Sequence, residues 1–146
     1  MLKIEKKTST LLSLVSTVVF FVGLLAAAVF LPFYIRMIAF PSGLDPFFYI
    51  IGYAVMLLAG VADWMLFLLL RLVRKGLIFT SRAVSLIRGI SWCCIGAGIL
   101  FAVLAFFFVI CGAVAFTAVF VGLCIRVVKN AVEEAVEIKS ENDLTV

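Results

Sequence analysis

Four long apolar stretches dominate this chain, because charged side chains are scarce between Leu11 and Ile125. Within those limits they are confined to Arg36, Asp45, Asp63 and a basic cluster from Arg71 to Arg88. A helix that crosses a membrane needs about 20 consecutive apolar residues, and 66% of the 146 residues here are hydrophobic. The sequence therefore predicts a single integral membrane domain, with the lipid bilayer as its surroundings.

The apolar stretches predict an all-α fold, an integral membrane four-helix bundle. We expect the spans at about 11–35, 47–70, 89–108 and 112–128. The last two share one uncharged run, 89–125, which would be about 55 Å long as a single helix, whereas the hydrocarbon core is about 30 Å thick. The run must therefore fold back, and we place the turn at about 108–112. The first run is longer than the apolar core of a signal peptide, so we interpret it as a span.

The distribution of basic residues predicts how the chain is oriented. Of the 12 Lys and Arg residues, Arg36 alone would lie outside, beside a loop that ends at Pro46. Because Lys and Arg are enriched in cytoplasmic loops, both termini are expected on the cytoplasmic side together with the other 11 basic residues. In the outer loop, Asp45 is expected to cap the second span and Pro46 to occupy its first position.

A basic connection, 71–88, joins the second and third spans on the cytoplasmic side. Thr80 or Ser81 can cap a helix there, and this helix is expected to lie in the membrane interface before it turns into the third span. Its apolar face, at helical spacing, would carry Ala83, Leu86, Ile87 and Ile90. One interpretation is a docking or lipid-sensing element, and the other is an ordinary basic lead-in that obeys the positive-inside rule.

The chain closes with an acidic tail, 129–146, that is expected to continue the fourth helix beyond the bilayer. Opposite charges would let this tail contact the basic connection of its own chain or of another; the alternative is a solvated helix end. We assign the two segments together as a candidate surface for a cytoplasmic partner. The residues of that surface are Arg71, Arg74, Lys75, Phe79, Arg82, Arg88, Glu133, Glu137, Glu141 and Asp143.

Two short segments of the chain resemble a known family. One runs from Lys75 to Thr80, with Lys-Gly-x-x-Phe-Thr before the third span, and the other is the acidic ending Glu-x-x-Leu-Thr-Val within 135–146. Their order and spacing are similar to those of domain-of-unknown-function family 2975, a group of small four-span bacterial membrane proteins. The chain departs from the family at Ser81 and Arg82, because in the family acidic residues usually follow the turn. It also departs at Leu77 and Ile78, which replace a more polar pair of the family.

The resemblance implies a multi-pass protein of the bacterial cytoplasmic membrane. Genes of the family often lie beside a small helix-turn-helix regulator of the Cro type. What this neighbourhood implies for the chain is a cytoplasmic partner rather than a reaction.

A polar layer is expected inside the membrane around Asp63, the one acidic residue within a predicted span. At about 1.5 Å per residue, Asp63 lies roughly 12 Å from the border at Arg71. The same count puts Thr117, Ser16 and Thr17 at similar depth, so their hydroxyls are the expected hydrogen-bond partners. Without partners, a carboxyl in a span costs about 2.5 to 3.5 kcal/mol.

Stripes of small residues at helical spacing run along the predicted spans. They include Gly23, Ala27, Gly52, Ala59, Cys94, Gly98, Ala102, Ala105, Ala115, Ala118 and Gly122. Small residues let membrane helices approach closely. Asp63 shares its stripe with Gly52 and Ala59, so its side chain is expected to face the interior.

The chain lacks the residues that most catalytic and metal sites use. It contains no histidine, and its four cysteines, Cys93, Cys94, Cys111 and Cys124, lie in apolar runs without a C-x-x-C pair. No credible ligand set for zinc remains, and the commonest general base is absent. We therefore expect no enzyme, no cofactor and no metal. Direct nucleic-acid binding is not expected either, because the basic residues border the membrane.

The leading functional prediction is a non-enzymatic regulatory or sensor protein that engages a cytoplasmic partner such as a small helix-turn-helix regulator. One alternative is a small proton-coupled exporter that uses Asp63 as its proton or cation site, and another is self-immunity to a membrane-active peptide. The signal and the oligomeric state are left open. The neighbouring genes would discriminate between these, since an adjacent regulator favours the first reading and an export or toxin cassette the others.

Overall fold

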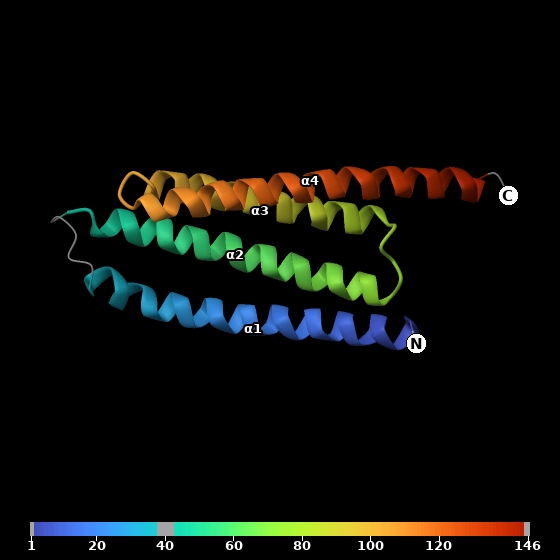
Figure 1. Cartoon of the computed structure of the whole chain (residues 1–146), viewed down its shortest axis with the longest axis horizontal. Helices are drawn as coiled ribbons and strands as arrows, with labels where there is room; N and C mark the ends of the chain where they lie inside the picture. Colours follow the sequence, from blue (N-terminus) through green and yellow to red (C-terminus); the bar gives the residue numbers. More distant parts are fainter. Residues whose placement is uncertain (1, 38–42, 145–146) are drawn as a thin grey trace.

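Four long helices follow one another along the chain in the computed structural model (Figure 1). They are α1 (Leu2–Met37), α2 (Asp45–Arg74), α3 (Ser81–Leu104) and α4 (Val109–Leu144). The structure describes the backbone of residues 2–37 and 43–144, and the side chains of 11–37, 43–142 and 144. All four helices are long and apolar enough to cross a membrane. The prediction of an all-α multi-pass membrane protein is confirmed to that extent.

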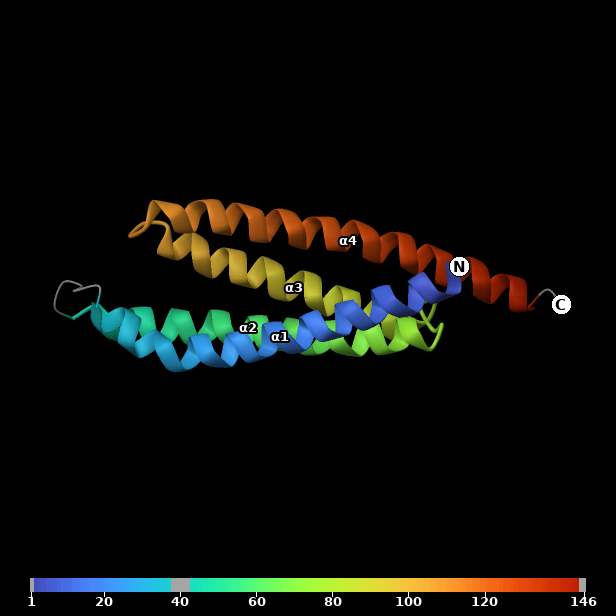
Figure 2. The ribbon, with the colours of Figure 1, turned by 60° about the horizontal axis from the view of Figure 1, so that its bottom comes forward.

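The helices pack in chain order and leave one side of the bundle open. The packed pairs are α1 with α2, α2 with α3, and α3 with α4. Within the described ranges no comparable packing joins α1 to α4. Figure 2 shows α3 lying between α4 and the pair formed by α1 and α2. The predicted four-helix bundle is therefore an open, serial one.

The closest approach is between α3 and α4, and small residues make it possible. A Cβ atom added to Gly98 would lie 3.1 Å from the carbonyl oxygen of Ala115, and one added to Gly122 would lie 3.2 Å from that of Ser91. The Ser91 hydroxyl also donates a hydrogen bond of 2.8 Å to the carbonyl oxygen of Gly122. The predicted small-residue stripes of these two helices therefore form a tight backbone-to-backbone contact.

The stripe expected on α1 is packed over only part of its length. Gly52 of α2 lies against Leu31 of α1, whose Cδ2 atom would be 2.9 Å from an added Cβ. Around Gly23, in contrast, no described atom lies within 4 Å of the added Cβ. The expectation that Gly23 lies at a helix contact is wrong.

The turn between α3 and α4 lies at 105–108, a few residues before the predicted 108–112. The amide of Phe108 donates to the carbonyl oxygen of Leu104 over 2.9 Å and closes the turn. The ring of Phe107 packs edge-on against that of Phe48 at the start of α2, with centroids 5.2 Å apart. Aromatic packing between distant segments therefore accompanies this turn, and no polar or glycine signal marks it.

The entry into α2 differs from the predicted cap. Leu44 is the N-cap residue, and it makes no side-chain capping bond. Asp45 instead lies in the first turn, where a carboxylate interacts favourably with the helix dipole. Pro46 is the second residue of the helix, one place after the expected first position. The rest of the predicted outer loop, 38–42, lies outside the described residues.

The start of α3 follows the predicted pattern, with one difference. The amide of Ala83 donates to the Thr80 hydroxyl over 3.4 Å, so Thr80 is the cap. Ala83, Ile87 and Ile90 are buried, as the helical spacing predicts. However, α3 runs as one helix from Ser81 to Leu104. The prediction of a turn between an interfacial helix and the third span is therefore wrong. The apolar face that was expected to lie in the membrane interface packs against the other helices instead.

Candidate functional site

The charged segments gather at one end of the molecule, which we call the charged end. It consists of the last turn of α2, the first turns of α3 and the part of α4 that follows Val128. In Figure 1, α4 continues past the start of α3 toward the C-terminus. The exposed charged side chains of this end are Arg71, Arg74, Lys75, Arg82, Arg88, Glu134, Glu137, Lys139 and Glu141.

The connection from α2 to α3 is built as a helix stop followed by a helix start. Gly76 adopts φ +71°, a conformation that L side chains rarely take. The amide of Gly76 donates to the carbonyl oxygen of Val73, and that of Leu77 donates to that of Leu72, both over 3.0 Å. This pairing is a Schellman motif, and Thr80 then caps α3. The Lys-Gly-x-x-Phe-Thr segment thus sets where α2 ends and where α3 begins.

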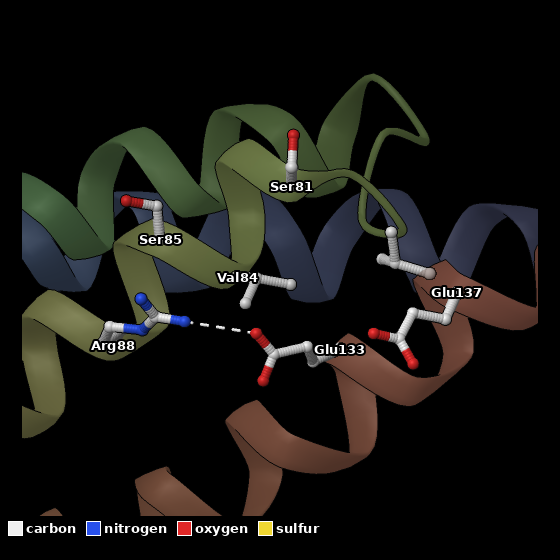
Figure 3. A pocket seen from close by; sticks show the side chains of 7 residues that line it. Ser81, Val84, Ser85, Arg88, Glu133 and Glu137 are labelled. Carbon is white, nitrogen blue, oxygen red and sulfur yellow. Dashed lines mark hydrogen bonds and ion pairs between the residues drawn. The ribbon is translucent and has the colours of Figure 1, made fainter. Parts of the chain in front are cut away.

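An ion-pair network ties the start of α3 to the tail of α4. Arg88 Nη2 lies 3.1 Å from Glu133 Oε1 (Figure 3). Lys129, one turn earlier on α4, pairs with the other carboxylate oxygen of Glu133. The hydrogen bond from Lys129 is the main cause that holds the pKa of Glu133 below its ordinary value, and Arg88 adds to it. The tail therefore contacts the basic connection of its own chain.

A cavity of about 280 Å³ lies beside this ion pair, between α3 and α4. We call it the charged notch, and it is lined by Ser81, Val84, Ser85, Arg88, Glu133, Val136 and Glu137. Figure 3 shows the Arg88–Glu133 pair bridging the two helices and the Glu137 carboxyl one turn further along α4. The lining of the notch combines the apolar side chains of Val84 and Val136 with charges of both signs.

The other residues predicted for the partner surface are spread around the charged end rather than gathered in the notch. The guanidinium of Arg71 stacks on the ring of Phe67 in its own helix, 5.6 Å from the ring centroid. Phe79 is 48% exposed in the connection and offers an apolar contact. Arg74, Lys75, Arg82 and Glu141 are exposed. The side chain of Asp143 lies outside the described residues.

A second cavity, of about 430 Å³, lies around Asp63 in the apolar part of the helices. We call it the Asp63 groove. All four helices line it, with Ser16 and Thr17 from α1, Asp63 from α2, Cys93 and Cys94 from α3, and Ala118 from α4. Asp63 is 7% exposed and Thr17 is 6% exposed. The predicted polar layer thus contains Asp63, Ser16 and Thr17.

The hydrogen bonds expected within this layer do not form. Thr117 is exposed on α4 and donates to the carbonyl oxygen of Ala113 over 2.9 Å, so its assignment as a partner of Asp63 is wrong. Thr17 donates to the carbonyl oxygen of Leu14 over 2.8 Å. Among the side chains that the structure describes, none forms a hydrogen bond or ion pair with Asp63.

Two contacts between α3 and α4 were missed by the sequence reasoning. Ser91 is 2% exposed and bonds to α4, as described above. The guanidinium of Arg126 lies over the ring of Trp92, 5.0 Å from its centroid. Ser91 precedes Gly98 by two helical turns, so the small-residue stripe of α3 could have been extended to it. The Arg126–Trp92 contact had no comparable signal, since it depends on how the helices cross.

Comparison with known proteins identifies a family for this chain but no activity. No curated protein and no solved structure matches the chain. Residues 5–146 match the family described as Protein of unknown function (DUF2975). The match covers essentially the whole chain, including the turn at Gly76 and the acidic ending, and so confirms the resemblance. The chain therefore belongs to the DUF2975 family.

Proposed function

We propose that this protein is a non-enzymatic membrane regulator or sensor whose charged end binds a cytoplasmic partner. The observation that carries the proposal is the length of α4. It has 36 residues, whereas about 20 suffice to cross the hydrocarbon core. Roughly 24 Å of helix therefore extends beyond the core as an exposed, charged rod beside the start of α3.

The charges of this end favour a partner that carries both signs. Arg88 and Glu133 neutralise each other, whereas the rest of the charged end presents bases on the α2–α3 connection and acids on α4. Complementary charge steers association and fixes register. A small helix-turn-helix regulator is the partner that the family resemblance implies, held through its protein surface rather than through nucleic acid.

The proposal requires the charged end to lie in the cytoplasm. In a cysteine-free background, a single cysteine at Ser42 is expected to react with an impermeant maleimide added to intact cells, because Ser42 belongs to the predicted outer loop. A cysteine at Ser140, near the end of α4, is expected to react only after the cells are permeabilised. Labelling of Ser140→Cys in intact cells would contradict the orientation.

The partner surface is tested by neutralising acids on the α4 rod. In Glu137→Gln/Glu141→Gln, capture of the proposed helix-turn-helix regulator is expected to fall about tenfold, and wild-type capture should weaken as salt is raised. Co-purification from detergent extracts measures both. Asp45→Asn removes an exposed acid at the opposite end and serves as the matched control. Capture that is insensitive to both the double variant and salt would reject the surface.

A further inference from the structure

Asp63 is 7% exposed as a residue and lines the Asp63 groove, and no described side chain forms a hydrogen bond or ion pair with it. Apart from Ser16, Thr17 and the two adjacent cysteines, the rest of the groove lining is apolar, with Phe20, Leu58, Leu66 and Ala97 among the residues around Asp63. An ionised carboxylate in such surroundings is strongly disfavoured unless a counter-charge or hydrogen-bond donors reach it. No described Lys or Arg lines the groove, so a cationic ligand would supply the counter-charge that its lining lacks.

The groove is lined by two helices that do not pack on each other in the part of the chain that the structure describes, and in a bilayer the space between them would face lipid. Phe20 of α1 and Ala118 of α4 both line it, yet within the described ranges these two helices are not packed on each other. Asp63 precedes Arg71 by eight residues, which is about 12 Å along α2. A molecule that enters between α1 and α4 at this depth comes from the hydrocarbon layer and must itself be largely apolar.

The volume of the groove and the charge of the Asp63 carboxylate together indicate which kind of molecule could occupy the groove. A cavity of about 430 Å³ falls within the range of roughly 300–1,000 Å³ that small-molecule sites occupy. A lipid acyl chain would fill this volume but leave the carboxylate without a counter-charge. A second copy of the chain would not supply one either, because the apolar runs 11–35, 47–70 and 89–125 contain no Lys or Arg.

We propose that the Asp63 groove binds a lipophilic organic cation that partitions from the bilayer. The Asp63 carboxylate is the counter-ion, and the apolar side chains of α1, α2 and α3 surround the hydrocarbon or aromatic body of the ligand. Ser16 and Thr17 of α1 also line the groove. This site is separate from the charged notch and does not depend on the cytoplasmic partner.

Two ions of the same shape and opposite charge test the proposal. Tetraphenylphosphonium and tetraphenylborate are titrated by equilibrium dialysis against the detergent-solubilised full chain. We expect the cation to bind at least about tenfold more tightly than the anion. Asp63→Asn should weaken cation binding by about tenfold and leave anion binding unchanged, whereas Asp45→Asn, which neutralises an exposed acid at the far end of α2, should change neither.

A second pair of variants tests whether the ligand binds in the groove. Ala97→Leu fills part of the groove lining and is expected to weaken cation binding, whereas Ala102→Leu, at an exposed position of the same helix, should leave it unchanged. Equal binding of the two ions, absence of cation binding, unaltered binding by a folded Asp63→Asn, or equal effects of the two leucine variants would each overturn the proposal. If Asp63→Asn does not fold, the two ions and the leucine pair still decide.

Discussion

Gly98→Val is expected to destabilise the protein by about 3 kcal/mol, at the upper end of the usual cost of overpacking. The added Cβ would lie 2.6 Å from Val119 Cγ2, 3.1 Å from the Ala115 carbonyl oxygen and 3.2 Å from the Val119 amide nitrogen. The side chain of Val119 can rotate away, but the two backbone atoms can move only if α4 moves. The free energy of unfolding in mixed micelles, followed by far-UV circular dichroism, measures the loss.

The matched control for this prediction is Gly23→Val in α1. No described atom lies within 4 Å of a Cβ at Gly23, so the expected change is within about 0.5 kcal/mol. Both substitutions add the same atoms to a glycine in an apolar helix, and they differ in what those atoms meet. Equal losses in the two variants would contradict the close approach of α3 and α4 at Gly98.

Asp63→Leu is expected to stabilise the fold by about 1 to 3 kcal/mol, the penalty of leaving a polar group without a partner in largely apolar surroundings. The unfolded chain in micelles exposes the carboxyl to water, whereas folding places it in the Asp63 groove without a hydrogen bond from any described side chain. Leucine removes this penalty and adds apolar contact with the groove. The same unfolding titration in mixed micelles measures the gain.

Asp63→Asn is the control for the sign of this effect. An amide keeps the shape and the polarity of the side chain but not its charge, so stability close to wild type is expected. A loss of stability in Asp63→Leu comparable to the expected gain would mean that the carboxyl has a structural partner in the membrane. A more stable Asp63→Leu that no longer binds tetraphenylphosphonium would separate ligand binding from a structural role.

Features that depend on one segment at a time were predictable from the sequence. Hydropathy located the four helices, and the spacing around Thr80 located the cap of α3 and its buried face. Depth along a helix was also predictable, which is why Ser16, Thr17 and Asp63 reach the same groove. These properties follow from rise per residue and local hydrogen bonding.

Features that depend on rotation or on distant partners were not predictable. Thr117 has the expected depth, but Ala118 is the residue that lines the groove, because one residue turns a helix by about 100°. The turn at 105–108 lies where Phe107 meets Phe48, a contact between separate segments. Hydropathy also carries no information on which helices pair, so the open side of the bundle was not foreseen.

The unbroken course of α4 has a mechanical consequence. From Gly122, where α4 lies against α3, to Leu144 the helix is about 33 Å long. Tilting it by about 15°, a change within the scatter of helix crossing angles, would sweep its far end through about 9 Å. Such a tilt about the close contact at Gly122 would also separate Glu133 from Arg88, and Ala118 of the Asp63 groove lies one turn from that contact. A change in helix crossing inside the bilayer that broke this ion pair would be magnified into a displacement of the charged rod.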